Sequence, residues 1–493
     1  MRVFLAVHLP KLPLEVFRPR WLPEPAHGSA VLEKDKVVIA DRTAREAGVL
    51  LGMKRGGVMT LSPGTAMYER DVVREAAVQR EVGVALMKFS PDVALLDEAT
   101  VIVEVGASLR LFGGLLSLCR QAKAILDTFG VTARISVAPT GQGAWLLAKY
   151  RQGRGARRVL QLASLERVLL PLPMFAVPEI RPFIDWLAGL GCETIADVRR
   201  LPRAGLQRRC GEHLLDSLDR AFGTAPELFD WLELPPTFSA RIELPDRLEH
   251  ADGAVFAAHR LIVQLCGWLC AKQLAVTAVT LSIEHERGRQ ALTPTLIEIA
   301  LAEPAWREDH LLRLLKERMH RVELVAPAIA LRLDASKVES AAPDTDSLFP
   351  EPGGSPEDHA RLIELLIARL GDENVLRPAP TADYRPEIAN RWVPVSQVAK
   401  SIALPDSLPR PTWMLATPVR LLMRQHRPFY GSSLRMVSPA ERIEAGWFDG
   451  ELVTRDYFVA QADDRSCYWI YRERISSRDA EEAPRWFLHG LFG

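Results

Sequence analysis

Two adjacent carboxylates, Asp97 and Glu98, interrupt an otherwise apolar run of residues, "ALLDEATVIVEV" (94–105). Acidic side chains are poor strand formers and are rarely buried without a partner. Carboxylate oxygens are the ligands that Mg²⁺ prefers, and two such ions about 4 Å apart can activate a hydroxyl group and stabilise a leaving pyrophosphate. The pair therefore indicates a metal site, an ion pair with a basic neighbour, or a hydrated strand end.

The six cysteines offer less chemistry, because they are scattered and lack paired metal-ligand spacing. Cys266 and Cys270 are one helical turn apart, and we interpret them as buried core thiols in preference to a metal site. Six cysteines in 493 residues are too few for a disulfide framework, so we expect a reducing compartment.

The composition is that of a globular protein, with 48% hydrophobic and 25% charged residues. Its 62 basic and 62 acidic side chains cancel, so whole-chain charge gives no support for nucleic-acid binding, and any basic surface must be local. There is no apolar run of about 18 residues, and the start "MRVFLAVHLPKLPLEVF" lacks a cleavage site. We therefore expect a soluble, cytoplasmic chain without membrane contact, with about three to five domains.

Strands and helices alternate around the acidic pair. Residues 2–9 are predicted to form a short apolar strand, and residues 92–105 a strand rich in β-branched residues. A strand followed by a helix is predicted over 37–52, with Asp41 or Thr43 as the N-cap. This part should be a sheet covered by helices. Its further predicted elements are helices over 71–88, 115–130 and 143–150 and a strand over 131–139.

A helical hairpin is predicted over "FIDWLAGLGCETIADVRRLP" (183–202), with its turn at Gly189 to Gly191. The amides of such a turn can bind a backbone phosphate, and basic residues follow closely. A glycine turn between two helices is also common in proteins that bind no DNA, and the basic residues could form a solvated helix face. Both interpretations stay open. The arginines that we single out are Arg199, Arg200 and Arg203.

The second half of the chain changes character twice. Residues 236–335 return to an α/β pattern and are predicted to form a small domain with two helices on one sheet face. Residues 336–358 are poor in hydrophobic side chains and rich in Pro, Gly, Ser and Asp, which is typical of a flexible linker. An amphipathic helix is predicted over 359–371, and strand-like, tryptophan-rich segments over 412–493.

Taken in order, these elements resemble a Y-family (translesion) DNA polymerase. The matching stretches are "VVIADRTAREAGVLLGM", "LLDEATVIVEV", "ISVAPTGQGAWLLAKY" and the 183–202 hairpin. The resemblance implies an α+β multidomain fold, with a flexible linker and a C-terminal α/β region after the polymerase-like parts. These parts are palm-like 1–10 and 75–165, fingers-like 11–74, thumb-like 166–235 and little-finger-like 236–335, followed by the linker 336–358 and a C-terminal protein-interaction region 359–493.

Y-family polymerases hold two Mg²⁺ ions with three carboxylates, and the resemblance matches Asp97 and Glu98 to two of them. On the first strand, His8 and Pro10 stand where the family has its other acidic positions. A neutral imidazole brings no negative charge to the ions, and proline offers neither a carboxylate nor an N–H. We therefore expect a vestigial acidic pair, no catalysis, no bound metal and no cofactor.

Several alternatives remain at this site. Arg45 matches an arginine that contacts the incoming triphosphate in the family, and it or Lys149 could pair with the acidic residues. We expect His8 to be a surface-facing histidine at a strand end, in preference to a ligand. The rival hypothesis is an active polymerase in which a residue such as Glu104 substitutes for the lost ligand, and a third is a plain DNA-binding module.

The predicted linker contains "TDSLF", which resembles the bacterial sliding-clamp peptide QxxLF with threonine in place of glutamine. An extended peptide of this kind inserts its Leu-Phe pair into an apolar groove of the clamp. A chance apolar pair is the alternative. The predicted clamp-binding residues are Thr345, Asp346, Ser347, Leu348 and Phe349.

The tail extends the resemblance to the whole chain. Its motifs "AERIEAGWFDGELVTRDYFVA", "YWIYRER" and "RWFLHGLFG" resemble the ImuB family, the Y-family-like subunits of bacterial mutagenesis cassettes. The resemblance implies a nucleoid-associated, non-catalytic adaptor in damage-induced translesion synthesis. Its implied partners are DNA, the β sliding clamp, the RecA-like protein ImuA and an error-prone C-family DNA polymerase.

Two surfaces are predicted from this picture. Most tail aromatics should be core, while Trp486, Phe487, Leu491 and Phe492 are expected to be exposed anchors for a partner. DNA contacts should be sequence-independent and salt-sensitive. The predicted contact residues are Gly189, Gly191, Arg199, Arg200, Arg203, Arg287 and Arg289.

Overall fold

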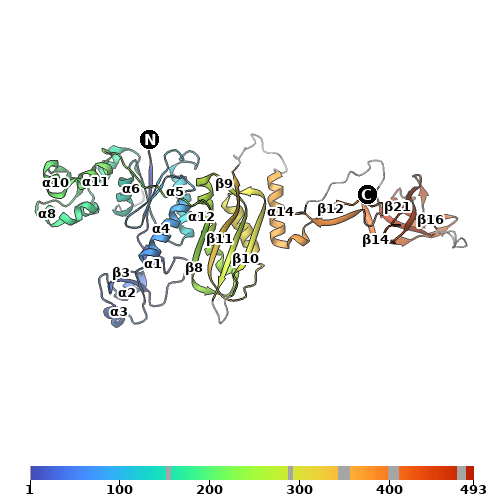
Figure 1. The fold of residues 1–493 in the computed structure, drawn as a ribbon, viewed down its shortest axis with the longest axis horizontal. Helices are drawn as coiled ribbons and strands as arrows, with labels where there is room; N and C mark the ends of the chain where they lie inside the picture. The colour runs from blue at the N-terminus through green and yellow to red at the C-terminus, as the bar shows by residue number, and fades with distance from the viewer. Residues whose placement is uncertain are drawn as a thin grey trace. The chain divides into compact units, whose positions relative to one another are not determined.

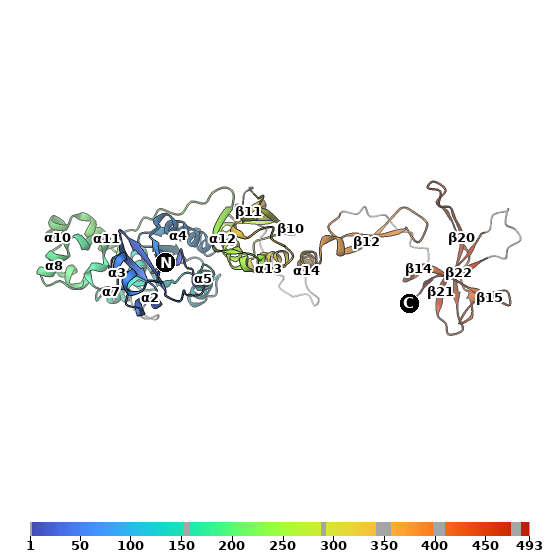
Figure 2. The same ribbon diagram turned by 90° about the horizontal axis from the view of Figure 1, so that it is seen from below.

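The structure, a computed structural model, describes residues 2–150, 157–286, 292–341, 356–397, 410–474 and 485–492. The chain forms two compact units, Met1–Leu365 and Leu366–Gly493 (Figures 1 and 2). Several separate sheets and many helices make up the chain, which confirms the predicted α+β multidomain fold class. No helix in the described ranges combines the length and apolar character needed to cross a membrane. The finer domain boundaries stay predictions.

The N-terminal strand lies inside an antiparallel sheet of order β5-β6-β1-β7, and every residue of β1 is buried. Leu5 and Val7 pack into the core that α4 and α5 complete, whereas Phe4 and Ala6 pack with α6. Because successive side chains alternate between faces, His8 falls on the α6 face. The bounds are β1 (Phe4–His8), β5 (Val93–Leu96), β6 (Thr100–Glu104), β7 (Arg134–Ala138), α4 (Val72–Leu86), α5 (Leu115–Thr128) and α6 (Gly141–Tyr150).

The acidic pair lies in a turn, so the prediction of a single strand over 92–105 was wrong. Strands β5 and β6 form a hairpin in which Leu96 pairs with Thr100, and Asp97, Glu98 and Ala99 connect them. Apolar residues on both sides of the turn mask the break, although acidic residues favour turns over strands.

A second, smaller sheet of order β3-β2-β4 follows the first strand along the chain. Asp41 is the N-cap of α2, as predicted, because its Oδ1 accepts a hydrogen bond from the Ala44 amide at 2.8 Å. Its Oδ2 accepts from the Ser29 amide at 2.5 Å, which ties the helix to β2. The elements are α1 (Leu12–Glu15), β2 (Ser29–Glu33), β3 (Lys36–Ala40), α2 (Arg42–Glu46), α3 (Arg55–Leu61) and β4 (Ala66–Glu69).

A group of short helices follows the first sheet, and it contains the predicted helical hairpin. Thr194 caps the second helix of the hairpin through a capping box with Asp197. The elements are α7 (Leu162–Leu169), η2 (Met174–Ala176), η3 (Pro178–Phe183), α8 (Ile184–Gly189), α9 (Ile195–Arg200), α10 (Arg203–Cys210) and α11 (Glu212–Phe222).

The third sheet is antiparallel, with strand order β10-β9-β11-β8, and carries two helices that contact each other. Two of its strands, β8 and β10, were not predicted individually. The elements are β8 (Ser239–Leu248), η4 (Ala251–Ala254), α12 (Val255–Lys272), β9 (Leu274–His285), β10 (Thr295–Ala305), α13 (Glu308–Met319) and β11 (Ala328–Ser340).

Helix α12 packs closely on α4 and joins the third sheet to the first. A Cβ atom on Gly267 would lie only 2.0 Å from the carbonyl oxygen of Val84, so the two backbones meet at this glycine. Arg260 on α12 donates from Nη2 to Glu81 on α4 at 2.5 Å, and its guanidinium lies over the Phe129 ring. This close approach makes the helix pair a continuous core.

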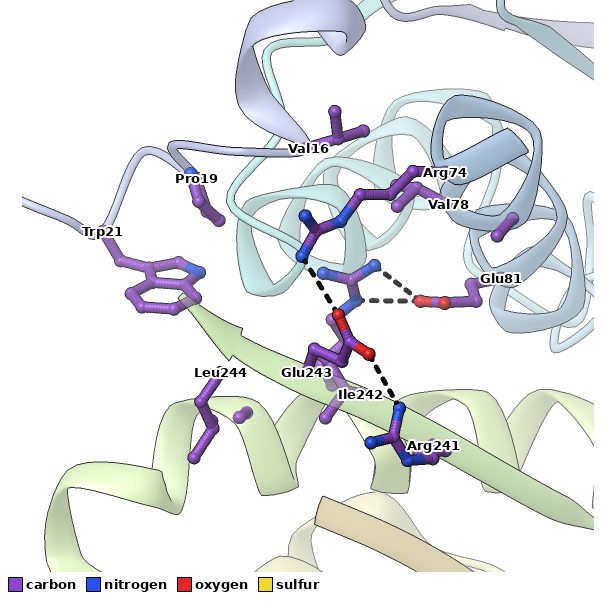
Figure 3. Close-up of a pocket in the computed structure, with 13 residues that line it drawn as sticks. Val16, Pro19, Trp21, Arg74, Val78, Glu81, Arg241, Ile242, Glu243 and Leu244 are labelled. Atoms are coloured by element: carbon purple, nitrogen blue, oxygen red, sulfur yellow. Dashed lines mark hydrogen bonds and ion pairs between the residues drawn. The ribbon is translucent and has the colours of Figure 1, made fainter. Parts of the chain in front are cut away.

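A cavity of about 220 Å³ lies beside this junction. The residues that line it are drawn in Figure 3. On its walls, Arg74 of α4 faces Glu243 of β8 at 3.9 Å, and Glu243 accepts from Arg241 at 3.0 Å. Arg241 also pairs with Glu284 at 3.0 Å. Alternating charges therefore line the seam between α4 and the third sheet.

The second unit is rich in strands. A β12–β13 hairpin precedes a six-stranded sheet, in which β14-β22-β21-β20-β18 follow in order and β19 also pairs with β20. Helix α14 (Pro356–Leu370) spans the boundary between the units. The other elements are η5 (Asp372–Asn374), β12 (Leu376–Pro380), β13 (Asn390–Pro394), β14 (Trp413–Arg420), β15 (Leu422–Arg424), β16 (Arg427–Tyr430), β17 (Ser432–Ser433), β18 (Arg435–Met436), β19 (Glu441–Ala445), β20 (Val453–Gln461), β21 (Cys467–Glu473) and β22 (Trp486–Leu491).

Aromatic side chains form much of the second unit's core. The rings of Tyr457 and Trp469 stack with centroids 4.1 Å apart, and both side chains are buried. The Tyr457 hydroxyl lies 2.8 Å from Nδ1 of the buried His489. This core confirms the prediction that most tail aromatics are internal.

The prediction of exposed anchors at the chain end was wrong. Strand β22 pairs with β14 on one side and β21 on the other, so Trp486 is buried and Phe487, Leu491 and Phe492 are partly buried. The exposed aromatics of the tail lie elsewhere and include Trp447 (78% exposed) and Phe448 (66%), between β19 and β20, together with Trp413 and Tyr430.

Replacing Gly267 with alanine should force α12 away from α4. We expect Gly267→Ala to lower the free energy of unfolding by about 2 kcal/mol, because the new methyl group meets backbone atoms that cannot move aside cheaply. Gly205→Ala in α10 is the matched control, since no atom lies within 4 Å of its Cβ position. The control should stabilise by about 0.5–1 kcal/mol through backbone entropy. Urea denaturation followed by circular dichroism measures both, and an unaltered Gly267→Ala variant would contradict the close packing.

Candidate functional site

A cavity of about 460 Å³ opens where the end of β1 meets the β5–β6 turn. The structure brings His8, Pro10, Asp97 and Glu98 together on its wall, as predicted. Lys149 from α6 and residues from the first turns of α4 complete the lining. The cavity is therefore formed by the sheet together with α4 and α6, the helices that cover opposite faces of that sheet.

His8 is the last residue of β1 and is only 8% exposed, so the expectation of a surface-facing histidine was wrong. Its Nδ1 lies 3.2 Å from the Thr100 hydroxyl, and its backbone pairs with Thr100 and Arg134 on the two neighbouring strands. Burial, with Lys149 and Arg134 nearby, lowers the pKa of His8 from 6.5 to about 4. The side chain is therefore neutral near pH 7.

Glu98 is neutralised by the protein's own cations. Its carboxylate forms ion pairs with Lys149 and with Arg181, whose Nη1 lies 2.6 Å from Oε1. Arg181 also donates to the Tyr150 hydroxyl at 3.2 Å. Burial, with Arg181 nearby, lowers the pKa of Lys149 to about 8, which still leaves most of it protonated at pH 7. Of the predicted partners, Lys149 is confirmed.

Asp97 is exposed, and within the described part of the chain its carboxylate has no hydrogen-bond or ion-pair partner. Its carbonyl oxygen lies 3.5 Å from Nε1 of Trp145. Glu98 and Ala99 have φ angles of 57° and 52°, a left-handed conformation that costs non-glycine residues about 1 kcal/mol or more each. The two ion pairs of Glu98 and the hydrogen bonds of Gln79 to the Leu96 and Thr100 carbonyls hold this turn.

Glu75 is the third carboxylate on the cavity wall, and it also has a cation of its own. Arg70 donates to both of its oxygens, at 2.8 and 3.0 Å, in a two-pronged pair. Arg70 reaches Glu33 as well, at 3.3 Å. Two of the three carboxylates therefore face guanidinium or ammonium groups and not an empty position for a metal.

These residues do not fit a pair of Mg²⁺ ions. Across the described ranges, no three His, Cys, Asp or Glu side chains are grouped so that they could hold a metal. Glu104 lies at the opposite end of β6 from the turn, where its Oε1 accepts from the Val3 and Gly106 amides at 3.1 Å each. It is therefore about 13 Å along the strand from the turn and cannot replace the missing ligand.

Arg45 lies on α2 and is not among the residues that line the cavity. Its Nε donates to the Asp41 carbonyl oxygen at 3.1 Å. Sequence reasoning missed both Arg181 and Arg70 at this site. Arg70 lies only five residues before its partner Glu75, whereas Arg181 contacts the site from a distant part of the chain. Arg181 lies 83 residues from its partner Glu98.

The helical hairpin uses its turn amides internally. Gly191 has φ +80°, and its amide donates to the Ala188 carbonyl at 2.9 Å. The Glu193 and Thr194 amides donate to Oδ2 of Asp197, at 3.2 and 3.0 Å. Asp197 thus occupies the place where a phosphate oxygen would be expected, and these bonds lower the pKa of its carboxyl.

The predicted DNA-contacting arginines of this region are paired with acidic residues. Arg199 pairs with Glu166 at 2.8 Å, and its guanidinium lies over the Phe222 ring. Arg200 lies 3.4 Å from Asp197. Arg203 donates two hydrogen bonds to the Asp219 carboxylate. Arg287 and Arg289 lie outside the described residues, as do the clamp-motif residues Thr345, Asp346, Ser347, Leu348 and Phe349. The DNA and clamp contacts stay predictions.

Comparison with known proteins bears on the whole chain. Two curated proteins, Protein ImuB from two strains of Caulobacter vibrioides (NA1000 / CB15N and CB 15), are each 24% identical to it over 480 residues. The match covers 90% of this chain and 100% of each relative. The chain is similar to ImuB. This confirms the resemblance inferred from the tail, and the ImuB match is longer than either compact unit alone.

Two solved structures are also similar, one described as a Dbh ternary complex and the other as a Y-family DNA polymerase chimera of Dbh and Dpo4. Both are 15% identical, cover 67% and 68% of this ImuB-like chain and 98% of their own chains, and have TM-scores of 0.39 and 0.37. Scores this low carry no argument about function. No protein-family model matches the chain.

The buried His8 should make the protein sensitive to mild acid. The pKa of His8 is about 4 in the folded chain, below the value of 6.5 for an unperturbed histidine in the unfolded chain. Because the unfolded chain therefore binds a proton more readily, the stability associated with neutral His8 is fully present above pH 6.5 and is lost as the pH falls toward 4. Over this range we expect the free energy of unfolding of the wild type to fall by about 3 kcal/mol more than that of His8→Asn. Urea denaturation at a series of pH values measures the difference.

His213→Asn is the control, since this histidine is exposed on α11 and should leave the wild-type pH dependence intact. If His8→Asn follows the wild-type curve throughout, His8 is not the buried neutral group described above.

Proposed function

We propose that this chain is a non-catalytic, Y-family-like adaptor in damage-induced translesion DNA synthesis. One observation carries the proposal: the protein's own cations neutralise two of the three carboxylates in the cavity, and a neutral histidine ends the central strand. A two-metal reaction needs negative charge at this place. Losing several kcal/mol of transition-state stabilisation corresponds to three or more orders of magnitude in rate.

The proposed parts follow the sheets of the structure. The sheet around β1 is palm-like (1–10 and 75–165), the small β2 sheet fingers-like (11–74), the short helices thumb-like (166–235) and the third sheet little-finger-like (236–335). The linker 336–358 carries the clamp motif, and residues 359–493 form the region for protein partners. The similarity to ImuB, which covers 90% of this chain, supports this assignment.

The proposed partners are those that the resemblance implies: DNA, the β sliding clamp, a RecA-like ImuA and an error-prone C-family polymerase that performs the synthesis. DNA binding is compatible with paired arginines, because an exposed ion pair contributes about 0–1 kcal/mol and a phosphate can replace the carboxylate. Arg203 is an example, because its side chain remains 64% exposed while it pairs with Asp219 and is therefore accessible to a phosphate that replaces this carboxylate.

A primer-extension assay separates the adaptor from an active polymerase. We expect no template-directed synthesis by the full chain with either Mg²⁺ or Mn²⁺, and no difference between the wild type and Asp97→Ala. An active Y-family polymerase serves as the positive control. Synthesis by the wild type that is lost in Asp97→Ala would refute the inactive assignment and favour the polymerase hypothesis.

The clamp motif is tested by binding of the full chain to purified β clamp. We expect the double variant Leu348→Ala, Phe349→Ala to weaken binding by about 100-fold or more, because each apolar anchor contributes about 1.5–3 kcal/mol when buried. Pro350→Ala, Glu351→Ala is the matched control within the same linker and should bind like the wild type. Absence of clamp binding by the wild type would mean that the Leu-Phe pair is a chance pair.

A further inference from the structure

The β15–β16 hairpin of the second unit is a small, exposed feature beside β21 (β16 is labelled in Figure 1 and β15 in Figure 2). Gln425 and His426 form its two-residue turn, with φ angles of 48° and 61°. Both angles are positive, as in the type I′ turns that match the twist of a hairpin. Strand β17 completes a three-stranded sheet, so the hairpin is a defined element.

The chain around this hairpin is strongly basic. Residues 420–437, "RLLMRQHRPFYGSSLRMV", contain four arginines and no aspartate or glutamate. In the part of the chain that the structure describes, Arg420, Arg424, Arg427 and Arg435 form no ion pair, and Arg435 donates only to the side-chain oxygen of Gln461. This contrasts with Arg199, Arg200 and Arg203, which all have carboxylate partners.

Two of these arginines face each other. Arg424 and Arg427 are cross-strand partners next to the turn, and like charges placed directly opposite destabilise a hairpin. Among the described residues, no hydrogen bond or ion pair joins a carboxylate to a residue of β15, β16 or β17. The arrangement therefore costs folding energy, which an external anion would recover.

The hairpin also exposes flat and apolar surface. Leu422 is 65% exposed, and Met423 and Tyr430 are exposed as well. The Arg424 guanidinium lies 4.0 Å from the centroid of the Phe429 ring, which holds the cation in a fixed orientation. Tyr430 stands edge-on against Tyr468, with ring centroids 5.5 Å apart. The short ribbon thus presents arginines, apolar side chains and an exposed ring together.

We propose that the β15–β16 hairpin binds single-stranded DNA. Arginines without ion pairs suit a phosphate backbone, and the exposed Tyr430 ring and apolar side chains suit unstacked bases, which a duplex keeps hidden. An acidic protein surface would satisfy the arginines but would leave Leu422 and Tyr430 without bases to cover them. The choice of DNA over RNA rests on the proposed function, whereas the choice of a single strand rests on the hairpin itself.

The test uses the full chain and a fluorescein-labelled oligo(dT) of about 16 nucleotides, with fluorescence anisotropy measured over a range of salt concentrations. We expect Arg424→Ser, Arg427→Ser to raise Kd about tenfold and to reduce the slope of log Kd against log salt by about 1.4, since each lost phosphate contact removes about 0.7 for a single strand. Tyr430→Ser should raise Kd about tenfold, whereas Tyr430→Phe should keep wild-type affinity.

Arg369→Ser, Arg391→Ser is the matched control, because it removes the same charge from exposed positions in the same unit. It should change neither Kd nor slope, and thermal unfolding should show that all variants fold. A wild-type slope in the hairpin variant, or an equal loss in the control, would overturn the proposal. The proposal would also be overturned if the hairpin variant lost affinity equally for duplex and single-stranded DNA, because that result would indicate a non-specific effect of positive charge. The binding assay does not depend on polymerase activity. If primer extension showed the chain to be an active polymerase, the proposed function would fail, but the result of this binding test would still stand.

Discussion

The central strand β1 is buried along its whole length, and this burial constrains everything at its end. A buried charge is tolerated only when another charge or several hydrogen bonds compensate it. His8 meets the constraint by remaining neutral against the Thr100 hydroxyl. A carboxylate at the same place would require cations, and the nearby cations Lys149 and Arg181 already pair with Glu98. Two of the three carboxylates on the cavity wall, Glu75 and Glu98, are thus neutralised by cations of the protein itself.

Opposite charges also pair with each other where α12 and the third sheet meet α4. Arg260 and Glu81 bridge α12 and α4, and Arg74 faces Glu243 across the seam of Figure 3. At Gly267 the backbones approach so closely that a side chain has no room. The third sheet is therefore fixed to the first by a shared core and by paired charges at its edge, which together resist sliding of one part on the other.

Long periodic elements such as β1, α4, α5 and α6 could be predicted from the sequence, because their apolar spacing is local information. The turn at Asp97 was missed because largely apolar strand sequence flanks it on both sides. The burial of β22 was misjudged because it depends on β14 and β21. The acidic pair was located correctly, but its neutralisation by Arg181 could not be predicted. That contact joins residues 83 positions apart, and only the folded chain brings them together.

The distribution of charge connects the closed cavity with the exposed hairpin. Equal numbers of basic and acidic residues make the chain neutral as a whole, and the arginines of the helical hairpin are matched to carboxylates. Net charge therefore says little about where an anion could bind, and the position of unmatched cations says more. Arg424 and Arg427 face each other across one exposed ribbon, where folding alone would favour opposite charges or none. The proposed contact with a nucleic acid strand at this ribbon rests on its unmatched cations, so it does not depend on metal chemistry at the cavity of Asp97 and Glu98.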